Sequence, residues 1–189
     1  MRGRSKGVMI ALAVAGAALA PVVARAQHAH AEERGALPQI PDGLRREHRE
    51  VHEELEWATK RPGRVGAAAR ALATVLHPHF VREEQVALPP LGLLAPLSRG
   101  ERPANAGAVL PLTDTLRREL PGMLREHVAI REATRRLREV AVAGKDARAV
   151  RLADDLAAHA TQEEEVTYPA ALLVGALLRA TGPHGAPDR

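Results

Sequence analysis

The sequence predicts an all-α fold, an antiparallel up-down-up-down four-helix bundle with an internal two-fold repeat. Ala, Leu, Arg and Glu dominate the chain, and it has no alternating β-branched run of strand length. Four segments carry apolar residues at helical spacing and end at Gly or Pro. One motif recurs in the second and fourth of these segments. Together these three observations predict the fold class.

The first half contains two predicted helices joined by a short turn. The first helix is expected from about Pro41 to Lys60 and stops at an Arg-Pro-Gly sequence. The second is expected from about Arg64 to Leu88 and stops at two consecutive prolines. Because the turn is so short, the two helices should be antiparallel neighbours.

The second half repeats this arrangement. Its helices are expected from about Thr113 to Ala143, ending at Gly144, and from about Asp146 to Thr167, ending at Pro169. A long loop, Leu91 to Leu110, joins the halves and contains a helical turn near its start. The apolar residues after the fourth helix should form a short helix that covers one end of the bundle.

The chain divides into four predicted regions. Residues 1–26 resemble a secretory signal peptide, because basic residues precede an apolar run and an Ala-Arg-Ala cleavage-like site. Residues 27–40 are a linker, residues 41–180 form the four-helix domain, and residues 181–189 are a disordered tail. We therefore expect an exported protein with no membrane segment after cleavage, periplasmic in a Gram-negative host.

Composition excludes several classes of function. The signal segment holds four of the 27 basic residues and none of the 23 acidic ones, so the rest of the chain is formally neutral. One Trp, one Tyr and one Phe offer no stacking platform for single strands, and we expect no nucleic-acid partner. The absence of Cys excludes disulfides, iron–sulfur clusters and thiolate metal sites, so any metal must be held by nitrogen and oxygen.

A repeated motif carries the chemistry. The pattern His-x-x-x-Glu-Glu-x-Val-x-x-Pro begins at His79 and again at His159. About thirty residues earlier in each half, an Arg-Glu-His sequence ends at His48 and His127. A His and a Glu four residues later share one helical face, so each half directs two His and one Glu toward a common interior. The six candidate metal ligands are His48, His79, Glu83, His127, His159 and Glu163.

These six polar residues fall on the apolar stripes of their helices. In the third helix the expected stripe includes Leu120, Leu124, His127 and Ile130, and in the fourth it ends with His159, Glu163 and Val166. Buried unpaired carboxylates cost several kcal/mol, and a cation removes that cost. Two divalent ions, bridged by both carboxylates and each bound by two imidazoles, would use every inward-facing polar group. The alternative is a set of ordinary buried His and Glu residues without metal.

Other polar residues near the motif have weaker claims. His52 lies at the edge of its stripe, and Glu84 and Glu164 are alternative bridging carboxylates one residue after the preferred ones. His77 points away from the site, and Tyr168 either packs in the core or hydrogen-bonds near the centre. His28 and His30 belong to the linker, where adventitious copper or nickel binding is the alternative to a disordered segment.

At these residues the chain resembles the hemerythrin family, the HHE cation-binding domains, over about Pro41 to Pro169. The resemblance implies a non-haem di-iron centre that binds oxygen or related small molecules. It implies that one iron is bound by His48 and His79 and the other by His127 and His159, with Glu83 and Glu163 bridging. The oxygen-carrying members have a second His four residues from the one on the third helix. Here Met123 and Arg131 stand at those positions, so both irons should keep an open position.

The leading hypothesis is a di-iron protein that binds or senses O2, NO or peroxide, or buffers iron. An oxidoreductase such as a peroxidase on the same scaffold is the second hypothesis, and a metal-free helical interaction module is the third. A ferritin-like enzyme is disfavoured because its Glu-x-x-His spacing occurs at none of the nine histidines. Mixed imidazole and carboxylate ligands suit iron or manganese better than zinc, and the resemblance favours iron. The physiological ligand and any protein partner remain open.

Overall fold

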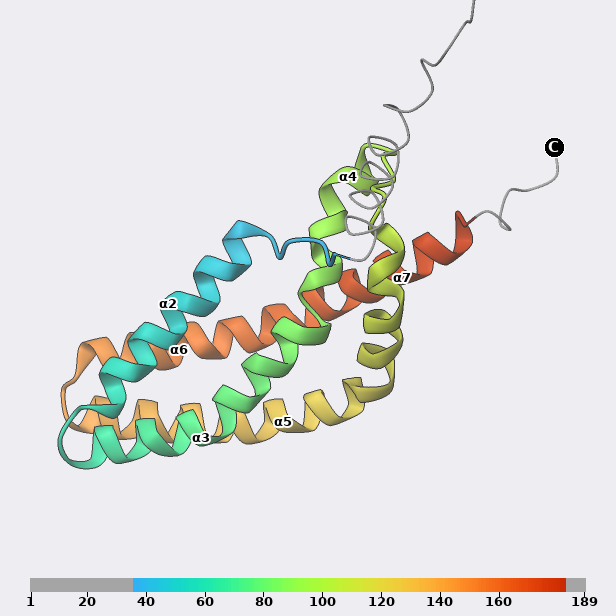
Figure 1. The fold of residues 1–189 in the computed structure, drawn as a ribbon. Coiled ribbons are helices and arrows are strands. Elements are labelled where there is room, and N and C mark those ends of the chain that lie inside the picture. The colour runs from blue at the N-terminus through green and yellow to red at the C-terminus, as the bar shows by residue number, and fades with distance from the viewer. Residues whose placement is uncertain (1–35, 183–189) are drawn as a thin grey trace, which may run out of the picture.

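The structure is a computed structural model that describes residues 36–182, and all regular elements in this part of the chain are helical. The predicted signal segment, most of the linker including His28 and His30, and most of the C-terminal tail lie outside the described residues. Figure 1 shows the arrangement of the helices. The elements are α2 (Asp42–Thr59), α3 (Gly63–Val86), η1 (Pro89–Leu93), α4 (Leu94–Ser98), η2 (Ala106–Val109), α5 (Leu110–Ala143), α6 (Ala147–Gln162), η3 (Glu163–Thr167) and α7 (Tyr168–Ala180).

Four long helices, α2, α3, α5 and α6, form the bundle, as the all-α prediction requires (Figure 1). Helix α3 packs against α2 and α5, and α6 packs against α5 and α2, which closes the ring. None of the helices among residues 36–182 combines the length and the hydrophobicity that crossing a bilayer requires. The predicted ends of the first three helices agree with the structure to within three residues.

The predicted end of the fourth helix is wrong. Helix α6 stops at Gln162, and the chain continues through the π-helical turn η3 directly into α7. Pro169 does not end the helix, because it lies in the first turn of α7, where a missing backbone N–H is tolerated. The predicted loop between the halves contains more helix than expected, in η1, α4 and η2.

Apolar side chains of the described residues form three clusters, two of which lie along the bundle. The larger one fills the end where α2 joins α3 and α5 joins α6, and includes Leu55, Leu72 and Leu137. The second, which includes Leu88 and Met123, lies where α7 packs on α5 and η1 packs on α7. Along all four helices, the six predicted ligand residues lie between the two clusters, so the polar layer has an apolar layer on either side.

Two residues predicted for the core are exposed, Leu124 and Val166. In α5 the buried position is Met123, four residues before His127, and not Leu124, three residues before it. Val166 lies in η3, where the wider π-helical turn rotates the side chain away from the face that an α-helix would give it.

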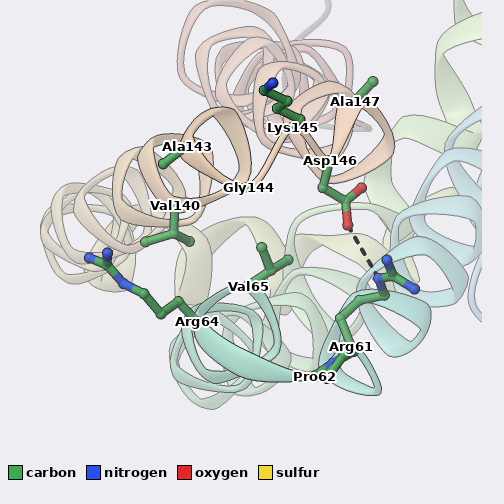
Figure 2. Close-up of a pocket in the computed structure, with 10 residues that line it drawn as sticks. All are labelled: Arg61, Pro62, Arg64, Val65, Val140, Ala143, Gly144, Lys145, Asp146 and Ala147. Carbon is green, nitrogen blue, oxygen red and sulfur yellow. Dashed lines mark hydrogen bonds and ion pairs between the residues drawn. The ribbon is translucent and has the colours of Figure 1, made fainter.

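The two short turns meet at one end of the bundle. Figure 2 shows Arg61, from the turn after α2, reaching toward Asp146, with Nε 3.2 Å from the carboxylate. The other carboxylate oxygen of Asp146 accepts a hydrogen bond from the Ala149 amide and caps α6. Lys145 precedes it with a positive φ of 55°. These contacts join the turn between α2 and α3 to the start of α6.

Helix α7 crosses the start of α5 closely. A Cβ atom placed on Gly175 would lie 2.4 Å from Thr113 Oγ1, so only glycine allows this approach. At the same crossing the Arg179 guanidinium binds the Asp114 carboxylate at 2.5 Å. This packing fixes α7, and with it Tyr168 at its first position, against the bundle.

Candidate metal centre

The structure brings all six predicted ligand residues together in the interior. Helix α2 supplies one, α3 two, α5 one, α6 one and the first position of η3 one. Each is nearly inaccessible to solvent, with at most 6% of the residue exposed. The residues are His48, His79, Glu83, His127, His159 and Glu163.

The potential ligand atoms fall into two groups that share both carboxylates. One group is His48 and His159 with Glu83 and Glu163, and the other is His79 and His127 with the same two carboxylates. Within each group one ligand atom from every residue lies within 4.8 Å of the others. The arrangement therefore has room for two ions side by side.

The grouping of the histidines differs from the expected one. The family resemblance paired His48 with His79 and His127 with His159, whereas the structure groups His48 with His159 and His79 with His127. Each of the four helices packs against two others, so both groupings join neighbouring helices. The direction of the side chains decides between them, because those of α3 and α5 meet at one position and those of α2 and α6 at the other. Each candidate metal position therefore draws one His from each half of the chain.

Each carboxylate turns one oxygen toward each group. Glu83 Oε1 is 3.4 Å from His79 Nε2, and its Oε2 is 3.9 Å from His48 Nε2. Glu163 Oε2 is 3.3 Å from His127 Nε2, and its Oε1 is 2.7 Å from His159 Nε2. A carboxylate that bridges two metal ions presents its oxygens in this way.

Several buried atoms of the site have no hydrogen-bond partner. Glu163 Oε1 and His159 Nε2 approach closely but not at an angle that makes a hydrogen bond, and His48 Nε2 and Glu83 Oε2 have no partner either. An unsatisfied buried polar atom costs about 1–3 kcal/mol, more when charged. A cation between these atoms would satisfy them all, so the donor set fits a metal centre.

The other ring nitrogen of each histidine faces a further carboxylate. His79 Nδ1 is 2.7 Å from Glu126, His127 Nδ1 is 2.8 Å from Glu164, and His159 Nδ1 is 2.9 Å from Glu47. Glu84 lies 3.5 Å from His48 Nδ1. A carboxylate that accepts from Nδ1–H leaves the Nε2 lone pair free for a metal and orients the ring.

These four outer carboxylates complete the site. The structure sets Glu84 and Glu164 outside the inner layer, so the alternative in which they replace Glu83 and Glu163 as bridges does not fit. Sequence reasoning missed Glu47 and Glu126. The signal was present in the repeated Arg-Glu-His sequence, which carries a Glu immediately before each histidine.

Burial and mutual contacts shift the pKa values of the inner groups. Burial is the largest influence on the pKa of His159 and lowers it, but Glu163 and Glu47 outweigh burial and raise the pKa to about 9. Burial raises the pKa of Glu83. Burial also acts to raise the pKa of Glu163, but the surrounding histidines lower it far below its usual range. The pKa values of the two carboxylates are thus shifted in opposite directions.

Tyr168 belongs to the site and not only to the core. Its Oη donates a hydrogen bond to Glu83 Oε1 and lies 3.3 Å from His79 Nε2 and 3.2 Å from His127 Nε2. Burial and the nearby Glu83 and Glu163 charges raise the pKa of its phenol, so the metal-free protein keeps it protonated. The sequence left two roles open for Tyr168, packing in the core and hydrogen bonding near the centre. The structure shows both.

The remaining candidates lie outside the two groups. Met123 is buried in the apolar cluster, and Arg131 binds the Glu164 carboxylate at 2.8 Å, so neither supplies a ligand. The rings of His52 and His77 meet edge to face at the rim of the bundle, with centroids 5.8 Å apart.

Two surface clefts reach the histidines. One of about 530 Å³ lies between α3 and α5 and is lined by His79 and Glu126. The other, of about 590 Å³, lies between α2 and α6 and is lined by His159 and Glu47. Each cleft therefore lies against one histidine and the outer carboxylate that faces the Nδ1 atom of that histidine.

Comparison with known proteins agrees with this geometry. The family model for the hemerythrin HHE cation binding domain matches residues 39–171, which include every residue of the two groups. No curated protein and no solved structure matches the chain. The matched region covers well over half of the 189 residues. This chain belongs to the hemerythrin HHE cation-binding domain family.

Proposed function

We propose that this protein binds two non-haem iron ions and, through them, binds or senses O2, NO or peroxide, or buffers iron. One observation carries the proposal: each of two buried carboxylates turns one oxygen toward each of two histidine pairs. One ion would be held by His48 and His159 and the other by His79 and His127, with Glu83 and Glu163 shared between them.

The charge of the site supports two divalent ions. The interior holds two carboxylates and four imidazoles whose Nδ1 atoms face outer carboxylates. In a low-dielectric interior such a set is stable only when positive charge lies among the inner oxygens and nitrogens. Imidazole and carboxylate together suit iron or manganese, whereas zinc prefers a closed tetrahedral site. Membership of the hemerythrin family favours iron.

The surroundings of the site support a small ligand. An iron pair supplies redox chemistry and open coordination positions for a diatomic molecule or peroxide. The protein contributes a dry chamber, since apolar clusters lie on both sides of the polar layer. The cleft beside His159 is lined by five acidic and two basic residues, which favours the approach of a cation and is consistent with iron buffering.

We also propose that the bundle is an up-down-up-down arrangement of two related halves. The contacts around the site support this, because they come in equivalent pairs. Glu47 precedes His48 and contacts His159, while Glu126 precedes His127 and contacts His79. The short turns at one end of the bundle agree with antiparallel neighbours.

The proposed location is the cell envelope. The basic and apolar residues within positions 1–26 are typical of an export signal, which would direct the domain to the periplasm of a Gram-negative host or to the exterior. Amino-terminal sequencing of the protein recovered from its native host tests this, and a chain that still begins at residue 1 would contradict it.

Iron titration tests the function. We expect the full chain to bind two ferrous ions and, after oxidation, to show an optical spectrum that changes when azide or NO is added. The variant Glu163→Gln removes a bridging charge and should bind fewer than two ions. Glu165→Gln, an exposed residue two positions later, should bind two. Equal stoichiometry in both variants, or no ion in the wild type, would contradict the proposal.

A di-iron oxidoreductase, such as a peroxidase, is the second candidate. The clefts beside His79 and His159 favour it, because each places a solvent-filled space next to one histidine of a group. Steady-state consumption of peroxide by the iron-loaded protein, well above that of the same amount of free iron, would support the enzyme over the binding protein. Stoichiometric reaction without turnover would favour binding.

A further inference from the structure

The two candidate metal positions are not equivalent. Beside His79 and His127 lies a phenol oxygen, Tyr168 Oη, at 3.3 and 3.2 Å from their Nε2 atoms. Beside His48 lies a phenyl ring, Phe80, stacked on the imidazole with centroids 4.4 Å apart. One position therefore has an additional oxygen, and the other has an apolar wall.

The hydrogen bonds around Tyr168 leave lone pairs on its oxygen available to a metal ion. Tyr168 donates its O–H to Glu83 Oε1. When the Nδ1–H groups of His79 and His127 donate to Glu126 and Glu164, the Nε2 atoms of both rings present lone pairs as well. These two nitrogens are 2.8 Å apart. Three lone-pair atoms thus converge on one point, which is the arrangement of a set of metal ligands.

The π-helical turn η3 brings Tyr168 to this place. Tyr168 is nine residues after His159, which is about two and a half turns of an uninterrupted α-helix and would put it on the opposite face. The wider turn at Glu163–Thr167 takes up part of this rotation and returns Tyr168 to the side of the site. Turns of this kind occur frequently at functional sites.

Within the described residues, the first half of the chain has no counterpart of the π-helical turn followed by a tyrosine. Leu88 occupies the equivalent position nine residues after His79, and it packs in the apolar cluster. Helix α3 remains α-helical through Val86. The segment that carries Tyr168 therefore adds an oxygen to one metal position only.

We propose that Tyr168 Oη is a ligand of the metal ion held by His79 and His127, so that the two ions of the centre have different ligand sets. The ion held by His48 and His159, beside Phe80, is then the one with more open positions and the one that takes up the exogenous ligand. The phenolic proton is released to solvent as the ion binds. This inference rests on the proposed di-iron centre.

Spectroscopy of the iron-loaded full chain tests the inference. Tyr168 is the one tyrosine of the sequence, so any tyrosinate-to-iron(III) charge-transfer band, and any tyrosinate vibration enhanced by excitation into it, must come from this residue. We expect both signals in the wild type and neither in Tyr168→Phe, which keeps the ring in the core. Phe80→Leu, which removes the aromatic ring beside the other group, should keep both signals.

Iron content separates the inference from the proposed function. Two irons per chain with tyrosinate signals in the wild type and in Phe80→Leu, but not in Tyr168→Phe, support both. Two irons per chain without a tyrosinate signal in the wild type overturn the inference alone. A wild type that binds no iron overturns both. Fluorescence of the single Trp57 and far-UV circular dichroism show that each variant is folded.

Discussion

His79 Nε2 and His127 Nε2 lie 2.8 Å apart in the interior, and neither has a proton to share with the other when both Nδ1 atoms donate to carboxylates. Two lone pairs at this distance repel each other unless a proton or a metal ion lies beside them. The fold therefore brings together groups that are stable only with positive charge among them, and it does so on α3 and α5, two helices of the bundle that pack against each other.

Removing the metal should destabilise the fold. Ligand binding to the native state adds free energy of unfolding, about 3–4 kcal/mol when free iron exceeds the dissociation constant by 100- to 1,000-fold. We expect the melting temperature to fall after treatment with a chelator and to recover when iron is restored. An unchanged melting temperature would support the metal-free interaction module.

The metal-free protein should lose stability as the pH rises. The pKa of His159 is raised to about 9 in the folded state, from about 6.5 in an unfolded chain. The stability from its charged ring is complete below about pH 6.5 and disappears as the pH passes about 9, a loss of about 1–3 kcal/mol. Urea unfolding of the chelated protein between pH 6 and 10 measures this. His159→Gln should flatten the profile, and an equally steep profile in that variant would assign the effect elsewhere.

The outer carboxylates should control metal affinity without binding metal. In Glu126→Gln the His79 ring loses its charged acceptor, so iron should bind about 10- to 100-fold more weakly, with two ions still bound at saturation. Glu132→Gln, an exposed residue of the same helix that pairs with Arg135, is the matched control and should bind as tightly as the wild type. Competition with a chelator of known affinity measures the iron affinity of both variants. Equal affinities in the two variants would show that Glu126 does not influence the metal site.

Gly175 should be essential to the position of α7. A Cβ atom there would meet Thr113 Oγ1, so Gly175→Ala should cost about 1–3 kcal/mol of unfolding free energy. Gly122, inside α5, offers the comparison, because its nearest atom is the end of the Arg125 side chain at 3.7 Å. Gly122→Ala should stabilise by up to about 1 kcal/mol through helix propensity. Denaturant unfolding measures the change in unfolding free energy of both variants. Equal changes would contradict the close crossing of α7 and α5.

The sequence alone was sufficient to predict the all-α fold class and the meeting of the six inner residues in the interior. Periodicity assigns residues to helix faces, and a motif repeated with conserved spacing marks the same face of two helices. His48 and His127 could be found in this way because each interrupts an apolar stripe. Such reasoning is reliable wherever a helix is regular.

The rest depends on relations between helices. Which histidines share a metal position depends on how the side chains of adjacent helices meet across the bundle, and the spacing within one helix does not contain that information. Val166 was misjudged, and the role of Tyr168 was left open, for another reason. The π-helical turn between them and His159 changes the rotation per residue, and nothing in the Glu-rich sequence of η3 distinguishes it from an ordinary α-helical turn.

Anomalous diffraction at the iron absorption edge, from crystals of the iron-loaded protein, is the most direct measurement. We expect two peaks inside the bundle, one between His48 and His159 and one between His79 and His127, both in contact with the Glu83 and Glu163 carboxylates. A single peak, peaks at the surface, or an interior without iron would contradict the di-iron centre.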